Sequence, residues 1–271
     1  MTESHRPTLL FAHANGFPGG SYRSLLAPLK ERFDIQPLDR LGHHPDFPVG
    51  HNWLALRDEY LDSTRDLPGP FIGVGHSMGG VITAMAARQA PERFQAVVML
   101  DPPLMLGLDA MAMRLSKWLG MVDRVTPAGK SKGRRARWES RDAMRAQLRR
   151  KGLFRAFTPE ALDDYIEAGT TVLEDGSAVL SYDPDIEVEI FRHLPHHLDR
   201  LPREVAVPIG VLAGASSDLL TPSRCRRLSR RGIVLETVPG THMFPMEQPD
   251  ATREALLSMI DRLLAPEGAR K

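Results

Sequence analysis

A serine with a glycine two positions away on either side is the feature of this sequence best suited to chemistry. Ser77 stands between Gly75 and Gly79, after an apolar run and before a helical stretch that begins at Met78. In such a G-x-S-x-G segment the serine occupies a strained strand-to-helix turn that points its hydroxyl out of the sheet, and the glycines leave room for it. We expect Ser77 to act as a nucleophile, with the N–H of Met78 as one donor to an oxyanion.

A serine hydroxyl needs a base to accept its proton, and the base needs a carboxylate to hold its ring. His242 follows the apolar run 233–238 and is the expected base. Asp218, in the loop after the preceding apolar run, is the expected carboxylate. The order serine, aspartate, histidine differs from that of the chymotrypsin and subtilisin types. Asp101 is the rival carboxylate, which we expect instead to shape the pocket or to hold a hinge.

Short apolar runs alternate with helical patterns along most of the chain. The runs indicate buried parallel strands at 8–13, 34–39, 70–75, 95–101, 207–213 and 233–238. The helical patterns cover 22–32, 53–66, 78–90, 222–231 and 250–264. This alternation predicts an α/β fold, with a mostly parallel sheet and helices on both of its faces. Ser77 and His242 should then lie together at the carboxyl edge of the sheet.

The alternation is interrupted at 102–202, where helical patterns occur with almost no strand. We therefore expect an α/β core formed by 1–101 and 203–271, with 102–202 inserted as a helical cap. The Met- and Leu-rich stretch 104–113 and Trp118 are interpreted as the cap's own core, or else as the lining of an apolar pocket over the site.

The cap also carries a basic segment, with twelve basic and two acidic residues between 124 and 155. Five of its arginines follow helical spacing: Arg134, Arg137, Arg141, Arg145 and Arg149. They predict one charged stripe on the solvated face of a helix. The alternative is a surface for a phosphate-bearing acyl donor or an anionic lipid.

Composition excludes several classes of function. The 271 residues carry a formal net charge of +1, which gives no field that would attract nucleic acid. A single cysteine, Cys225, excludes an intrachain disulfide and a multi-cysteine zinc site. Pro195 interrupts the histidines at 193–197, so no metal is expected there. Without a long apolar run, the chain is expected to be cytoplasmic and not inserted in a membrane.

Jointly, these motifs resemble those of the α/β-hydrolase superfamily, in particular its cap-bearing, esterase-like members. The segment 13–20 is similar to the family's oxyanion loop, 39–43 to its D-x-R-G-H-G turn, 214–218 to its G-x-x-D loop and 240–249 to its histidine segment. The loop at 13–20 is about two residues longer than the usual H-G-x-P. Phe17 or Asn15 could therefore supply the second oxyanion N–H, and Phe17 is favoured because Gly16-Phe17-Pro18 aligns with G-x-P.

The resemblance implies hydrolysis of a carboxylic ester, or of a related acyl bond, through an acyl-enzyme and without a cofactor. A serine nucleophile argues against the haloalkane dehalogenases and epoxide hydrolases of the superfamily, which use aspartate. The substrate is expected to be a small, apolar ester that contacts His76, Asn15 and Tyr182. Alternatives are thioester or carbon–carbon bond hydrolysis with the same triad, or a ligand-binding protein that has lost turnover.

Overall fold

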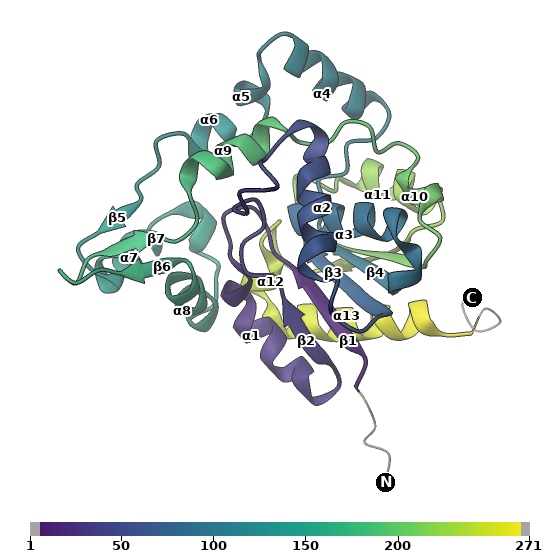
Figure 1. Ribbon diagram of the computed structural model, residues 1–271, viewed down its shortest axis with the longest axis horizontal. Coiled ribbons are helices and arrows are strands. Elements are labelled where there is room, and N and C mark those ends of the chain that lie inside the picture. The colour runs from purple at the N-terminus through teal and green to yellow at the C-terminus, as the bar shows by residue number, and fades with distance from the viewer. Residues whose placement is uncertain (1–5, 267–271) are drawn as a thin grey trace.

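The computed structural model describes residues 6–266, and its centre is a six-stranded sheet in which every neighbouring pair is parallel (Figure 1). The strand order is β2-β1-β3-β4-β8-β9. The bounds are β1 Thr8–Ala12, β2 Asp34–Pro37, β3 Phe71–His76, β4 Phe94–Leu100, β8 Ile209–Gly214 and β9 Val234–Val238. All six predicted strands are confirmed to within two residues at each end.

Helices cover both faces of this sheet (Figure 1). The longer ones are α2 (Leu54–Ser63), α3 (Met78–Gln89), α11 (Pro222–Ser229) and α13 (Pro249–Leu264), and the shorter ones are α1 (Arg23–Leu26) and α12 (Phe244–Glu247). The helix predicted at 22–32 is broken into α1 and flanking 3-10 turns, because Pro28 lies at the start of the second turn, Ala27–Glu31, and cannot continue an α-helix. Within 6–266 no helix is long and apolar enough to cross a membrane.

The alternation of side chains along β1 shows why both faces are covered. Leu9 and Phe11 belong to one buried apolar cluster, and Leu10 and Ala12 belong to the other. Successive side chains of a strand point to opposite faces, so a strand that is apolar throughout must be buried on both. All five residues of β1 are buried. The carboxyl ends of these strands therefore form the one edge where loops can carry a site.

Residues 102–208, which we call the insertion, leave the sheet after β4 and return to it at β8. Its helices are α4 (Leu108–Trp118), α5 (Val122–Val125), α6 (Ala128–Ser131), α7 (Arg141–Leu148), α8 (Pro159–Ala168), α9 (Pro184–Arg192) and α10 (Leu201–Glu204). It also holds a small antiparallel sheet of β5 (Arg137–Trp138), β7 (Ala178–Leu180) and β6 (Thr170–Val172), which was not predicted. Strands of two or three residues are too short to show an alternating pattern.

The single helical stripe of arginines predicted for the insertion is wrong. Helix α7 begins only at Arg141, because the Ser140 hydroxyl accepts a hydrogen bond from the Ala143 N–H and caps the helix. Arg137 lies in β5 and pairs with Asp175 at 2.5 Å. Arg145 pairs with Asp163 at 2.6 Å. These arginines are thus neutralised one by one on different elements.

Candidate active site

Ser77 occupies the sharp turn between β3 and α3, with φ of 53°. A positive φ is uncommon for a residue with a side chain and marks local strain. The neighbouring glycines are required by space: a Cβ on Gly75 would lie 2.4 Å from the Gly79 carbonyl carbon, and one on Gly79 would lie 2.2 Å from the Ala12 oxygen. The turn therefore has the form that the sequence predicted.

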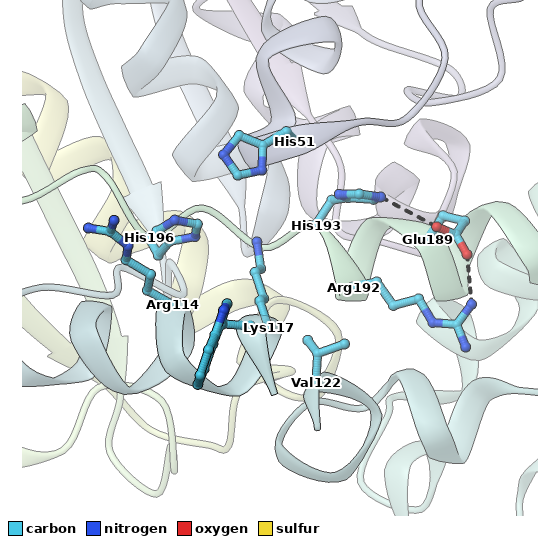
Figure 2. Close-up of a pocket in the computed structure, with 9 residues that line it drawn as sticks. His51, Arg114, Lys117, Val122, Glu189, Arg192, His193 and His196 are labelled. Atoms are coloured by element: carbon cyan, nitrogen blue, oxygen red, sulfur yellow. Dashed lines mark hydrogen bonds and ion pairs between the residues drawn. The ribbon is translucent and has the colours of Figure 1, made fainter. Parts of the chain in front are cut away.

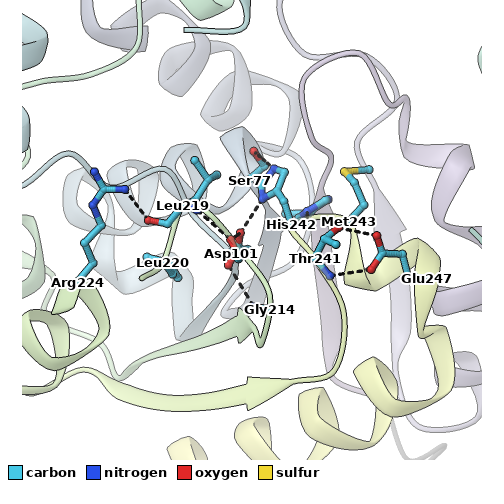
Figure 3. A network of polar contacts seen from close by, with 12 residues as sticks. Ser77, Asp101, Gly214, Leu219, Leu220, Arg224, Thr241, His242, Met243 and Glu247 are labelled. Carbon is cyan, nitrogen blue, oxygen red and sulfur yellow. Dashed lines mark hydrogen bonds and ion pairs between the residues drawn. The ribbon is translucent and has the colours of Figure 1, made fainter. Parts of the chain in front are cut away.

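His242 reaches Ser77 from the loop after β9, as Figure 3 shows. Its Nε2 lies 3.0 Å from the serine Oγ. The loop is held by Glu247, whose buried carboxylate accepts hydrogen bonds from the Thr241 N–H at 2.7 Å and the Thr241 hydroxyl at 2.5 Å. Gly240 makes the turn with φ of 117°, where a Cβ would lie 2.7 Å from that carboxylate. Glu247 thus fixes the approach of the imidazole to the serine.

The carboxylate that meets His242 is Asp101, so the expectation for Asp218 is wrong. Asp101 Oδ2 lies 2.7 Å from His242 Nδ1, while Asp218 is exposed. Asp101 ends the strand next to that of Ser77, and its backbone φ of 44° turns the chain at this point. Its side chain is fully buried. Asp101 is the first residue after β4 and is close enough to contact His242, whereas Asp218 lies four residues beyond the end of β8.

Three donors surround the Asp101 carboxylate. Besides His242, the Gly214 N–H donates to Oδ1 at 3.2 Å (Figure 3), and the Ser217 hydroxyl donates to Oδ2 at 2.5 Å. These hydrogen bonds satisfy the oxygens of the buried carboxylate. Ser217 was missed by the sequence analysis, although the spacing offers a signal: counted from Gly214, the fourth position of G-x-x-D is Ser217, not Asp218.

The expectation that the Phe17 N–H is the second oxyanion donor is also wrong. The Phe17 N–H donates to the Ala14 carbonyl at 3.0 Å and closes a turn in which Gly16 has φ of 78°. Its ring lies against that of Tyr165, with centroids 4.8 Å apart. The hydrogen bond that closes this turn does not use the N–H of Asn15. Met78 opens α3, where first-turn N–H groups have no partner within the helix.

His76 is a structural residue and not the expected substrate contact, because its side chain is fully buried. Its Nδ1 accepts a hydrogen bond from the Tyr22 hydroxyl at 2.7 Å, and its Nε2 donates to the His242 carbonyl at 2.9 Å. Burial, and then the nearby His242, lower the pKa of His76 well below its usual value and keep it neutral. Tyr22 also accepts from the Ala14 N–H at 3.1 Å. This chain links the oxyanion loop to the base.

The side chains of Asn15 and Tyr182 are likewise engaged inside the protein. The single proton of the Tyr182 hydroxyl is shared between the Leu41 carbonyl, at 3.1 Å, and Asn15 Oδ1, at 3.3 Å. The Asn15 amide donates to the Glu187 carbonyl, in α9, at 2.9 Å. Both residues are at least nine-tenths buried. They connect the oxyanion loop to the insertion, which is a different role from the substrate contact expected of their side chains.

An ion pair from the insertion packs against the same loop. Arg134 contacts the buried Glu187 carboxylate at 2.7 Å, and the Ser131 hydroxyl donates to it at 2.8 Å. Burial raises the pKa of Glu187, and Arg134 opposes this shift. Gly16 is needed here, since a Cβ would lie 2.9 Å from Glu187 Oε2. The loop conformation therefore depends on the insertion.

A family model described as the alpha/beta hydrolase family matches residues 9–255. The match covers most of the chain, which therefore belongs to that family. One relative, the 2-(acetamidomethylene)succinate hydrolase of Mesorhizobium japonicum, is 25% identical over 94% of this chain and 88% of its own length. Another, the 3-oxoadipate enol-lactonase 2 of Acinetobacter baylyi, is 24% identical over 96% of this chain and 91% of its own.

Some sequence matches are partial. The chain spans 30% of the length of a probable 1-acylglycerol-3-phosphate O-acyltransferase of Oryza sativa subsp. japonica, at 29% identity over 44% of this chain. Solved structures agree on the fold: E-2-(acetamidomethylene)succinate hydrolase superposes with a TM-score of 0.76, 24% identity and coverage of 95% of this chain and 92% of that one. A thioesterase domain from the curacin biosynthetic pathway gives a TM-score of 0.71 at 17% identity, covering 93% and 91%.

Proposed function

We propose that this protein is a serine hydrolase that cleaves a carboxylic ester through an acyl-enzyme intermediate. The observation that carries the proposal is the continuous series of contacts from Ser77 through His242 to Asp101, at 3.0 and 2.7 Å. Each contact is within reach for proton transfer or for holding the ring. The family assignment adds support, because enzymes of this fold carry a serine in such an elbow.

In the proposed first step, His242 Nε2 takes the proton of the Ser77 hydroxyl as the oxygen attacks the acyl carbonyl. The Met78 N–H and the Asn15 N–H are proposed to stabilise the oxyanion. His242 then gives the proton to the leaving alkoxide, which departs as the alcohol. Water deprotonated by the same imidazole cleaves the acyl-serine and releases the acid. Asp101 stabilises the imidazolium in both steps.

We also propose that the acyl group is small and apolar and that residues 102–202 act as the cap over it. In support, Phe17 joins the oxyanion loop to aromatic side chains of the insertion, with centroids 6.1 Å from Phe154 and 6.2 Å from Phe157. One relative is named for a succinate and another for an enol-lactone of 3-oxoadipate, so the discriminating comparison is a butyryl ester against a hemisuccinyl ester of the same phenol. Faster cleavage of the hemisuccinyl ester would refute the apolar preference.

Thioester cleavage is the second candidate, because a type I acyl-CoA thioesterase of Penicillium roqueforti is 27% identical over 58% of this chain and 38% of its own length. The same attack by Ser77 would release a thiol in place of an alcohol. A butyryl thioester beside the oxygen ester in the same assay separates the two, by the ratio of their kcat/KM values.

Labelling with a fluorophosphonate tests the nucleophile. The probe should attach to the wild-type protein and not to Ser77→Ala, whose ester turnover should fall by up to about six orders of magnitude. The matched control is Ser216→Ala, which changes an exposed serine of the loop after β8. Labelling that persists in Ser77→Ala would reject this assignment, and an unlabelled wild-type protein would favour a ligand-binding role.

A further inference from the structure

A cavity of about 670 Å³ lies between the insertion and the core, apart from the triad. Helix α4 contributes Arg114, Lys117 and Trp118, α9 and the loop after it contribute further basic side chains, and His51 comes from the core (Figure 2). None of Ser77, Asp101 and His242 is among the lining residues. A ligand in this cavity would therefore leave the triad free.

The charges around the cavity are unbalanced. Arg192 and Glu189 pair with each other at 2.8 Å, and Arg192 also pairs with Asp123 at 2.6 Å. Arg114 and Lys117, by contrast, have no carboxylate partner within residues 6–266. Among the described residues, Lys117 Nζ donates to the Leu194 carbonyl, at 2.7 Å, and to no carboxylate. Glu189, which also lines the cavity, pairs with Arg192 and with His193, so Arg114 and Lys117 face the cavity without a carboxylate partner of their own.

Imidazoles add further donors at the same place. His51, His193 and His196 line the cavity, and the rings of His51 and His196 lie 5.4 Å apart. The Nδ1 of His196 is buried without a hydrogen-bond partner in the described structure. Burial and the charge of Lys117 lower the pKa of His196 to about 4, and burial lowers that of Lys117 to about 8. An anion would reverse both shifts, since it favours the charged forms.

The cavity is not arranged for a metal ion, because no group of three His, Cys, Asp or Glu side chains in 6–266 could hold one. An indole from α4 also lines the cavity. Trp118 lines the cavity and is 80% exposed, unlike Trp53 at 1% and Trp138 at 3%. An exposed indole beside cations is suited to the organic part of a ligand whose anionic group contacts the cations.

We propose that this cavity binds a small phosphate ester, with the phosphate between Lys117, Arg114 and His196 and the organic group on Trp118. A phosphate presents several acceptor oxygens at once, which matches a set of donors from α4 and from the loop after α9. The proposal does not depend on the ester hydrolase activity.

Phenyl phosphate is the probe, and quenching of tryptophan fluorescence by acrylamide is the readout, because only Trp118 of the three tryptophans is exposed. Phenyl phosphate should protect Trp118 from acrylamide in a saturable way, more strongly than inorganic phosphate, while phenol should not. Lys117→Met should weaken this binding by about tenfold or more, since it removes a hydrogen bond to a charged group. Arg114→Ala should weaken it in the same direction.

The matched control is Arg124→Ala, an exposed cation of α5 outside the cavity lining, which should leave binding within about twofold. Ser77→Ala should bind phenyl phosphate as the wild type does, so a failure of the proposed hydrolysis would not affect this result. Equal binding by Lys117→Met and Arg124→Ala, with both folded by thermal melt, would overturn the proposal. So would protection of Trp118 by phosphatidate vesicles without any by phenyl phosphate.

Discussion

The loops that follow β4 and β8 leave neighbouring strands at the same edge of the sheet, yet they contribute different groups to the site. The loop after β4 carries Asp101, whose buried carboxylate contacts His242. The second leaves its carboxylate, Asp218, exposed and supplies the Ser217 hydroxyl to Asp101, which also accepts from the N–H of Gly214 at the end of β8. The loop after β4 thus carries the carboxylate, and the loop after β8 donates a hydrogen bond to it.

This division follows from the backbone at the strand ends. The Asp101 N–H donates to the Leu212 carbonyl at 2.8 Å, so the pairing of β4 with β8 continues to the residue that carries the carboxylate. The adjacent Leu100 carbonyl accepts from the Ser77 N–H at 2.8 Å. Asp101 is therefore fixed by the same hydrogen bonds that position the nucleophile. The loop after β8 has left the sheet before Asp218 is reached.

The largest expected difference between the two loops is in turnover. Asp101→Asn should lower kcat by about 10⁴-fold, because the amide presents His242 in the wrong tautomer. Asp218→Asn, the matched control on the other loop, should change kcat by less than about threefold, since an exposed charge is screened by solvent. Both variants should be measured on one aryl ester, with folding checked by thermal melt. The reverse ranking would return the acid to Asp218.

A carboxylate moved from one loop to the other should restore part of the activity. The Ser217 Oγ is 2.5 Å from the Asp101 Oδ2 that contacts His242, so a carboxylate carried at 217 is within reach of the same imidazole. Ser217→Asp added to Asp101→Asn should therefore raise kcat about tenfold or more above Asp101→Asn alone. Ser216→Asp in the same background is the control. Equal recovery from both additions would show that only general charge was restored.

The sequence predicts the sheet and the edge of the site because buried parallel strands appear as apolar runs and their carboxyl ends must meet. Ser77 and His242 could be placed for this reason. The choice between Asp101 and Asp218 could not be made in this way, since both follow strands that end at that edge. The spacing of the motif residues does not predict which of the two loops directs its carboxylate toward His242.

Other errors arise because polar contacts decide the roles of these residues. The His76 ring forms hydrogen bonds with the Tyr22 hydroxyl, 54 positions away, and with the His242 carbonyl, 166 positions away. The Phe17 N–H donates to the Ala14 carbonyl within a turn that depends on the positive φ of Gly16. A pattern of apolar residues carries no information on such polar contacts.

The smallest effect expected from these two loops is that of the Ser217 hydroxyl itself. Ser217→Ala removes one of three donors to Asp101 and leaves those of Gly214 and His242. A hydrogen bond to a charged group contributes about 1.5–3 kcal/mol. Ser217 is only partly buried, so water can replace part of this contribution, and we expect kcat to fall by about threefold to tenfold.

Because Ser217 touches Asp101 and not the reacting atoms, its loss should lower kcat while KM changes little. Ser217→Thr keeps the hydroxyl and should recover most of the loss, whereas Ser216→Ala should have no effect. If alanine and threonine at 217 gave the same kcat, the hydroxyl would have no part in positioning Asp101. Asp101 would then be supported from this side only by the N–H of Gly214, the last residue of β8.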